Sequence, residues 1–373
     1  MAARRPPFWI FLLFVAAFGL AGCEPYLSMT DQVPAQTRKA AALLPESPRY
    51  AGMVDLDTAM DQVDDLGIMN LDDRLRQASG PRLQTFLDAT GMDPKTDLEA
   101  MYGAVGEEGF SAVVVADLTP TQVRRYLDQA PGDAGRSTTY RGVSLFHLTD
   151  PEDTDGERPE DTLSLGFVQG GMIAAAMDEG RVKTMIDRYR EQPAGLRESE
   201  PYMRLIEQVG HGSTAWLVGR NVLQSALRDT ADEAAETTSA ASSRRPPTAE
   251  EAGIQSVLSE WTDRVLGLSE SASLGEEASN KIERLKSRVR EQAVSITLTD
   301  GTLEGEIHLT MRDETSAANV ANIAQGAVAA VKISQQESGG LRRDLLNDVT
   351  IDQRGSVVHV QFAVESEKVR QTV

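Results

Sequence analysis

The chain has 373 residues and a formal net charge of -20, with 40% hydrophobic and 25% charged residues. This length is sufficient for two domains or one large one, and the hydrophobic share is typical of a globular protein. An acidic surface repels the phosphate backbone of nucleic acid, so we expect no nucleic-acid partner.

The first 22 residues have the pattern of a lipoprotein signal peptide. Arg4 and Arg5 precede an apolar run at residues 8–20, which is shorter than the about 20 residues that a membrane-spanning helix needs. The run ends in Leu20-Ala21-Gly22-Cys23, which resembles the lipobox of bacterial lipoproteins. In that family the cysteine thiol receives a diacylglyceryl group, the peptide is cut just before it, and the new amino terminus is acylated.

Cys23 is the only cysteine in the chain, so it has no partner for an intramolecular disulfide. The resemblance implies lipidation at Cys23 by fatty acids such as palmitate, and two or more acyl chains give stable attachment to a membrane. It also implies a place in the cell envelope. Glu24 follows the cysteine, where an Asp favours inner-membrane retention, so we expect the periplasmic face of the outer membrane or the cell surface.

Residues 23–48 are predicted to be a membrane-proximal tether, because they are polar and contain several prolines. A short helix is expected within it at residues 38–44. The sequence Leu43-Leu44-Pro45 resembles the opening of uncharacterised bacterial envelope proteins, a resemblance that implies no activity.

Two lobes are predicted beyond the tether, at residues 49–228 and 253–373. Residues 229–252 are rich in Ala, Glu, Thr and Ser and have no apolar period, which is typical of a flexible linker or loop.

The N-terminal lobe is predicted to mix strands and helices. Thr119-Pro120-Thr121-Gln122 is a capping box with proline at the first helical position, and Gly170-Gly171 is typical of a hairpin turn. Strands are expected at residues 50–56, 110–116, 138–148, 163–168, 172–177 and 214–218. One or two helices are expected at residues 71–90, and further helices at residues 120–130, 179–190 and 202–209.

The C-terminal lobe is predicted to begin with helices at residues 254–268 and 281–292. Val294, Ile296 and Leu298 then alternate with polar residues up to a turn at Asp300-Gly301, and a second alternating strand follows. Asp313 is expected to cap the next helix. The inner face of that helix comprises Val320, Ile323, Ala324, Ala327, Val328 and Val331, and strands at residues 349–351 and 358–364 with a helix start at Ser366 complete the lobe.

A unit of hairpin strand, cap residue and amphipathic helix therefore recurs along the chain. Hairpins form antiparallel sheet, and each helix needs a sheet face on which to bury its apolar stripe. We expect an α+β fold with helices packed on one face of antiparallel sheets, arranged as two related lobes.

The four histidines do not form a catalytic motif. His308 and His359 fall on polar-facing strand positions and are expected to be solvated. His147 lies in a strand, and His211 lies between glycines near Ser213. No Gly-x-Ser-x-Gly nucleophile elbow is present, so we interpret His211 as structural.

No metal or cofactor motif is present either. The acidic stretch at residues 150–156 does not match an EF-hand, since Pro151 falls at the first ligand position, and is interpreted as a solvated loop. His-Glu-x-x-His, a cysteine cluster and a phosphate loop are missing, and the basic stretch at residues 281–290 is typical of a solvated helix face. We predict no catalytic, cofactor-binding or metal-binding residues and no cofactor.

These observations predict a membrane-anchored, non-enzymatic binding or structural module, with an envelope protein as the expected kind of partner and no defined oligomeric state. Two alternatives stay open. A hydrolase would need two carboxylates about 5–10 Å apart in a cleft, and a carrier would need an apolar cavity between sheet and helices.

Overall fold

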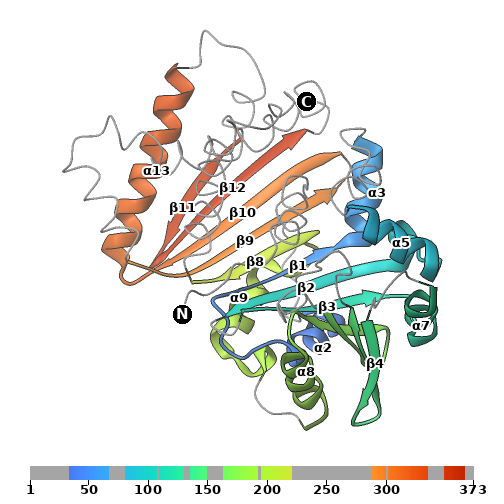
Figure 1. Ribbon diagram of the computed structural model, residues 1–373. Helices are drawn as coiled ribbons and strands as arrows, with labels where there is room; N and C mark the ends of the chain where they lie inside the picture. The colour runs from blue at the N-terminus through green and yellow to red at the C-terminus, as the bar shows by residue number, and fades with distance from the viewer. Residues whose placement is uncertain are drawn as a thin grey trace, which may run out of the picture. The chain divides into compact units, whose positions relative to one another are not determined.

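The computed structural model describes residues 33–66, 80–106, 109–129, 135–148, 163–191, 195–220, 288–299, 301–334 and 348–365 (Figure 1). The chain divides into two compact units, with Leu27–Leu217 in unit 1 and Val218–Val373 in unit 2. Antiparallel sheet and helices occur in both units, so the predicted α+β class is confirmed. No helix among the described residues is long and apolar enough to cross a membrane.

Unit 1 is built on an antiparallel sheet with the strand order β8-β1-β2-β3-β7-β6-β5-β4. Its strands are β1 (Tyr50–Asp55), β2 (Leu98–Gly106), β3 (Gly109–Ala116), β4 (Gly135–Tyr140), β5 (Val143–Leu148), β6 (Leu163–Phe167), β7 (Met172–Ala176) and β8 (Ala215–Gly219). Its helices are α2 (Ala35–Leu43), α3 (Leu56–Leu66), α5 (Gly80–Thr90), α6 (Pro94–Asp97), α7 (Pro120–Gln129), α8 (Glu179–Glu191), the 3-10 turn η2 (Leu196–Glu198) and α9 (Glu200–Val209).

Local sequence signals explain several of these boundaries. The capping box starts α7, because the Thr119 hydroxyl accepts from the Gln122 N–H at 3.3 Å while the Gln122 side chain accepts from the Thr119 N–H at 2.9 Å. Asp178 caps α8 by accepting from the Gly180 N–H at 3.0 Å. The predicted capping box is therefore confirmed.

Glycine turns set the hairpins of unit 1. Gly170 and Gly171 have φ values of 78° and 75°, as expected for the turn between β6 and β7. The single strand predicted at residues 138–148 is wrong, because Arg141 and Gly142 turn the chain with φ values of 48° and 77° and divide it into β4 and β5. Strand β2 was also missed.

Helices cover both faces of the unit 1 sheet, which differs from the prediction of one covered face. Val123 of α7 packs in one core cluster with Ile173 of β7, whereas Val182 and Ile186 of α8 lie against Gly166 on the opposite face of β6. All five residues of β7 are accordingly buried, as is typical of a strand enclosed on both sides.

The predicted tether is shorter in the structure than residues 23–48. Val33 is buried, as are Ala40, Ala41, Ala42 and Leu43 at the end of α2 and Leu44 just after it. The Leu196 N–H donates to the Leu44 carbonyl at 3.1 Å, next to a β-bridge between Pro45 and Gly195. The helix expected at residues 38–44 is thus part of the core of unit 1, because its alanines and leucines have neighbours to pack against.

Unit 2 has one four-stranded antiparallel segment with the strand order β11-β12-β10-β9. Its described elements are β9 (Val289–Thr299), β10 (Thr302–Met311), α13 (Glu314–Ser334), β11 (Thr350–Arg354) and β12 (Val357–Glu365). Asp313 caps α13 by accepting from the Ser316 N–H at 2.7 Å, as predicted. The helix expected at residues 281–292 is wrong at its C-terminal end, since Val289 already begins β9; the linker at residues 229–252 and the helix at 254–268 lie outside the described residues.

Helix α13 covers one face of the unit 2 sheet. Ala317 and Ala321 of the helix pack against Ile307, Leu309 and Val358. Ile323, expected on this face, is 43% exposed, because it precedes the buried Ala324 by one residue and so lies about 100° from it around the helix. The opposite face of the sheet carries alternate polar side chains.

Candidate functional site

Three potential metal ligands meet on the polar face of the unit 2 sheet. Glu306 and His308 lie two residues apart on β10, so both project from the same face. His359 on β12 lies directly opposite His308 in the strand register, and Gln361 lies opposite Glu306. The ligand atoms of Glu306, His308 and His359 all lie within 4.8 Å of one another.

The Glu306 carboxylate is at the centre of this cluster. Its Oε2 atom lies 3.4 Å from His308 Nε2 and 3.8 Å from His359 Nε2. Its other oxygen, Oε1, accepts a hydrogen bond of 2.7 Å from the Gln361 side-chain amide. One oxygen is therefore held by Gln361 while the other faces both imidazoles.

The cluster is partly buried, which contradicts the prediction that His308 and His359 are solvated. Their side chains are 15% and 21% exposed, and their rings stack with centroids 4.2 Å apart and planes inclined by 26°. His359 Nε2 is buried and has no hydrogen-bond partner among the described residues. Leaving a buried polar atom unsatisfied costs about 1–3 kcal/mol, so this nitrogen needs an explanation.

Hydrogen bonds to Glu306 and burial of Glu304 shift the pKa values of these two neighbouring carboxyls in opposite directions. The imidazole of His308, then that of His359, hold the pKa of Glu306 well below its usual range, although burial opposes them. Burial, followed by the charge of Glu306, raises the pKa of Glu304. Glu306 is thus ionised at neutral pH and is the negative centre of the cluster.

Sequence reasoning missed this cluster for a structural reason. Glu306-Ile307-His308 and His359-Val360-Gln361 are short alternating motifs, and a strand presents alternate residues on one face. The pairing of β10 with β12 spans α13 and is fixed by no hairpin turn between them. The sequence shows that each motif places its polar side chains on one face of a strand. It does not show that the two strands pair in the register that brings the motifs together.

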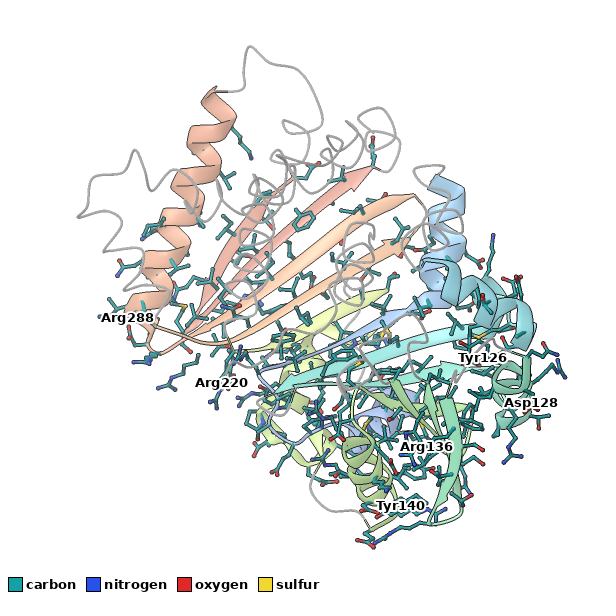
Figure 2. The ribbon with its side chains drawn as sticks, in the orientation of Figure 1. Tyr126, Asp128, Arg136, Tyr140, Arg220 and Arg288 are labelled. Carbon is teal, nitrogen blue, oxygen red and sulfur yellow. The ribbon has the colours of Figure 1, made fainter. Side chains whose placement is uncertain are left out.

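A second cluster lies in unit 1 around His147, which is 2% exposed. His147 Nδ1 is 3.0 Å from the Ser164 hydroxyl, and Nε2 is 3.5 Å from Glu179 Oε2. Glu179 also pairs with Lys183 at 2.6 Å and with Arg136 of β4, which is labelled in Figure 2, at 2.9 Å. Burial lowers the pKa of His147, while Glu179 partly offsets this effect.

Ser164, His147 and Glu179 have the residue types of a hydrolytic triad, but their placement does not support catalysis. Ser164 is 1% exposed, so its hydroxyl is closed to a substrate. The carboxylate of Glu179 is already paired with two cations. This cluster is best explained as a satisfied polar contact between the sheet and α8.

The other residues singled out in the sequence have structural roles or lie outside the described residues. His211 is exposed in a loop, and the Ser213 hydroxyl donates to the Val209 carbonyl at the end of α9. Arg288, which immediately precedes β9 and is labelled in Figure 2, donates to the hydroxyl of Ser316 in the first turn of α13 at 2.8 Å. Cys23 and the acidic stretch at residues 150–156 lie outside the described residues.

Comparisons with known proteins give no family. No protein-family model matches the chain, and no curated protein matches it. Among solved structures, crystal form III of TP0453 is similar at 8% identity with a TM-score of 0.44, covering 89% of this chain and 96% of that one. Crystal form I of TP0453 gives 8% identity and a TM-score of 0.43 over 93% and 98% of the two chains. Similarity of this size establishes neither family nor function.

Proposed function

We propose that the protein is a lipid-anchored lipoprotein of the bacterial cell envelope that acts as a non-enzymatic binding module. The observation that carries this proposal is the sequence Leu20-Ala21-Gly22-Cys23, preceded by two arginines and an apolar run and containing the only cysteine of the chain. Acyl chains on Cys23 would hold the protein on the membrane, since each buried methylene contributes about 0.8 kcal/mol.

The binding module in this proposal consists of two related lobes. Their strand orders support the relationship, because β6-β7-β3-β2 in unit 1 and β11-β12-β10-β9 in unit 2 are built in the same way. Each set consists of two hairpins, and the second strand of one hairpin pairs with the second strand of the other. These antiparallel pairs are β3 with β7 in unit 1 and β10 with β12 in unit 2. A helix, α7 or α13, follows the first hairpin in both.

The proposed location is the periplasmic face of the outer membrane or the cell surface. It rests on Glu24 at the position after the lipidated cysteine. The proposed partner is another envelope protein, since the acidic net charge of -20 disfavours nucleic acid and anionic headgroups. Separation of inner and outer membranes from the native cell, followed by detection of the protein in each fraction, tests the location.

The experiment that tests the anchor is intact mass measurement on protein extracted from its native membrane fraction. The expected protein begins at Cys23 and carries acyl mass, whereas a Cys23→Ser variant carries none and leaves the membrane. Ser28→Ala is the matched control, because it changes a small residue outside the four-residue motif and should be processed normally. Native protein that keeps residues 1–22 and carries no lipid would overturn the proposal.

A further inference from the structure

We propose that Glu306, His308 and His359 bind one divalent transition-metal ion, with zinc as the favoured occupant. The donor set is two imidazole nitrogens and one carboxylate oxygen, which suits zinc and its borderline neighbours. Three protein ligands would leave a position for water or another ligand. The proposal concerns unit 2 alone and does not depend on the lipid anchor.

The distances between the donor atoms are close to those that a metal ion requires. Zinc binds imidazole nitrogen and carboxylate oxygen at about 2.0–2.2 Å, so two ligands of one ion lie about 3.3 Å apart in a tetrahedral site and at most about 4.4 Å apart. Glu306 Oε2 already lies 3.4 Å from His308 Nε2 and 3.8 Å from His359 Nε2. Every pair in the cluster lies within 4.8 Å.

A small movement of the imidazoles would complete the geometry. The rings are nearly parallel, with 26° between their planes, whereas the lone pairs of two ligating imidazoles must converge on the ion. Rotation about the Cβ–Cγ bonds of the two histidines would change the directions of their nitrogen lone pairs, and this torsion has a broad energy well. The backbone need not move, because all three residues lie on paired strands.

The surrounding residues prepare the carboxylate to act as a ligand. Gln361 donates to Glu306 Oε1 at 2.7 Å, which fixes the orientation of the carboxylate and leaves Oε2 directed at the two histidines. Outer hydrogen bonds of this kind orient the ligands of established metal sites. Gln361 is therefore assigned the role of a positioning residue.

The alternative is a hydrogen-bonded cluster that never holds an ion. Such a cluster accounts for Glu306, which has His308 and Gln361 as partners. It accounts less well for His359 Nε2, which is buried, lies 3.8 Å from Glu306 Oε2 and has no partner within hydrogen-bond distance among the described residues. A bound ion supplies the partner that this nitrogen lacks.

The test uses the full chain, extracted from membranes in detergent, treated with EDTA and dialysed. Zinc is titrated in competition with a chromophoric chelator. We expect one equivalent of zinc to bind with a dissociation constant in the micromolar range or below. Magnesium and calcium should not displace it, because these ions prefer six or more oxygen ligands.

Three variants locate the site. His308→Gln and His359→Gln should each weaken zinc binding by more than about 100-fold, and Gln361→Leu by about 10-fold, in the range expected for a supporting residue. His211→Gln is the matched control, because it removes an exposed imidazole elsewhere in the chain, and it should bind zinc as the unaltered chain does. Cys23→Ser should also bind zinc normally, even if the anchor proposal fails.

A second measurement separates loss of a ligand from loss of the fold. Cobalt(II) should give visible absorption bands in the unaltered chain that are absent from both histidine variants, while far-ultraviolet circular dichroism shows that those variants are folded. The proposal is overturned if the unaltered chain binds no stoichiometric zinc. It is equally overturned if the folded His308→Gln and His359→Gln variants bind zinc as tightly as the unaltered chain.

Discussion

The ring of Phe362 on β12 lies over Gly305 on β10, directly opposite it in the strand register. A Cβ atom at Gly305 would meet three atoms of this ring at less than van der Waals distance. The glycine thus makes room for an aromatic side chain that covers the adjoining backbone.

Gly305→Ala should therefore lower the free energy of unfolding by about 1–3 kcal/mol, because the Phe362 ring must leave its position. Gly326→Ala in α13 is the matched control, since a Cβ there meets nothing within 4 Å. It should raise stability by up to about 1 kcal/mol through helix propensity. Chemical denaturation of both variants measures the two values, and equal effects of the same sign would contradict the packing of Phe362 on Gly305.

Thr119→Ala should destabilise the protein by about 1 kcal/mol, because the Gln122 N–H at the start of α7 loses its side-chain acceptor. Thr121→Ala two residues later is the control. Thr121 is exposed within the helix, so this change should be neutral or slightly stabilising. Denaturation midpoints measured side by side test this prediction, and a Thr121→Ala effect as large as that of Thr119→Ala would argue against the capping box.

The burial of His147 predicts a loss of stability in mild acid. Its pKa in the folded state lies below the ordinary value of 6.5, so the unfolded chain takes up a proton first as the pH falls. The free energy of unfolding should consequently decrease as the pH falls from about 6.5 towards the folded-state pKa, with a slope of at most about 1.4 kcal/mol per pH unit.

Denaturation in EDTA between pH 7.5 and 5 measures this slope, and comparison with variants separates the contribution of His147 from those of other groups. His147→Gln should remove part of it whatever its effect on stability at pH 7.5. His211→Gln, which alters an exposed loop, should retain the slope of the unaltered chain. An unchanged slope in His147→Gln would show that another group is responsible.

Tyr202→Phe should lower the free energy of unfolding by about 1–3 kcal/mol, because a buried carbonyl loses its donor. The Tyr202 hydroxyl donates to the Pro48 carbonyl and lies 3.5 Å from that of Arg49. Tyr126→Phe is the control, since it preserves the edge-on contact with Phe86, whose ring centroid is 5.2 Å away. Limited proteolysis should cut Tyr202→Phe near residues 45–50 sooner than the control, and equal rates would contradict the prediction.

Much of the secondary structure follows from signals within a few residues of one another. The capping box at Thr119, the Gly170-Gly171 turn and the alternation along β9 and β10 each predicted an element that the structure contains. Strand β2 was missed because Leu98–Gly106 is rich in alanine and glycine, which have low strand propensity. Burial between neighbouring strands overrides that preference.

The candidate site was less predictable because it depends on contacts between distant segments. His308 and His359 meet through the β10–β12 register, and Ser164 meets His147 through the β5–β6 register. In both cases the alternation indicates the face of a side chain but not its neighbour on the next strand. Burial of α2 was missed for the same reason, since its alanines reveal no partner.

The docking of α2 has a consequence for the order in which unit 1 is completed. The backbone just after α2 pairs with residues about 150 positions later in the chain: Leu44 with Leu196, Pro45 with Gly195 and Pro48 with Tyr202. These later residues are synthesised and exported after α2. If Cys23 is acylated as proposed, the ten residues from Cys23 to residue 32 reach at most about 35 Å. The segment of α2 would then reach the membrane before its partners are available. Unit 1 would complete its folding around this segment while held within that distance of the lipid.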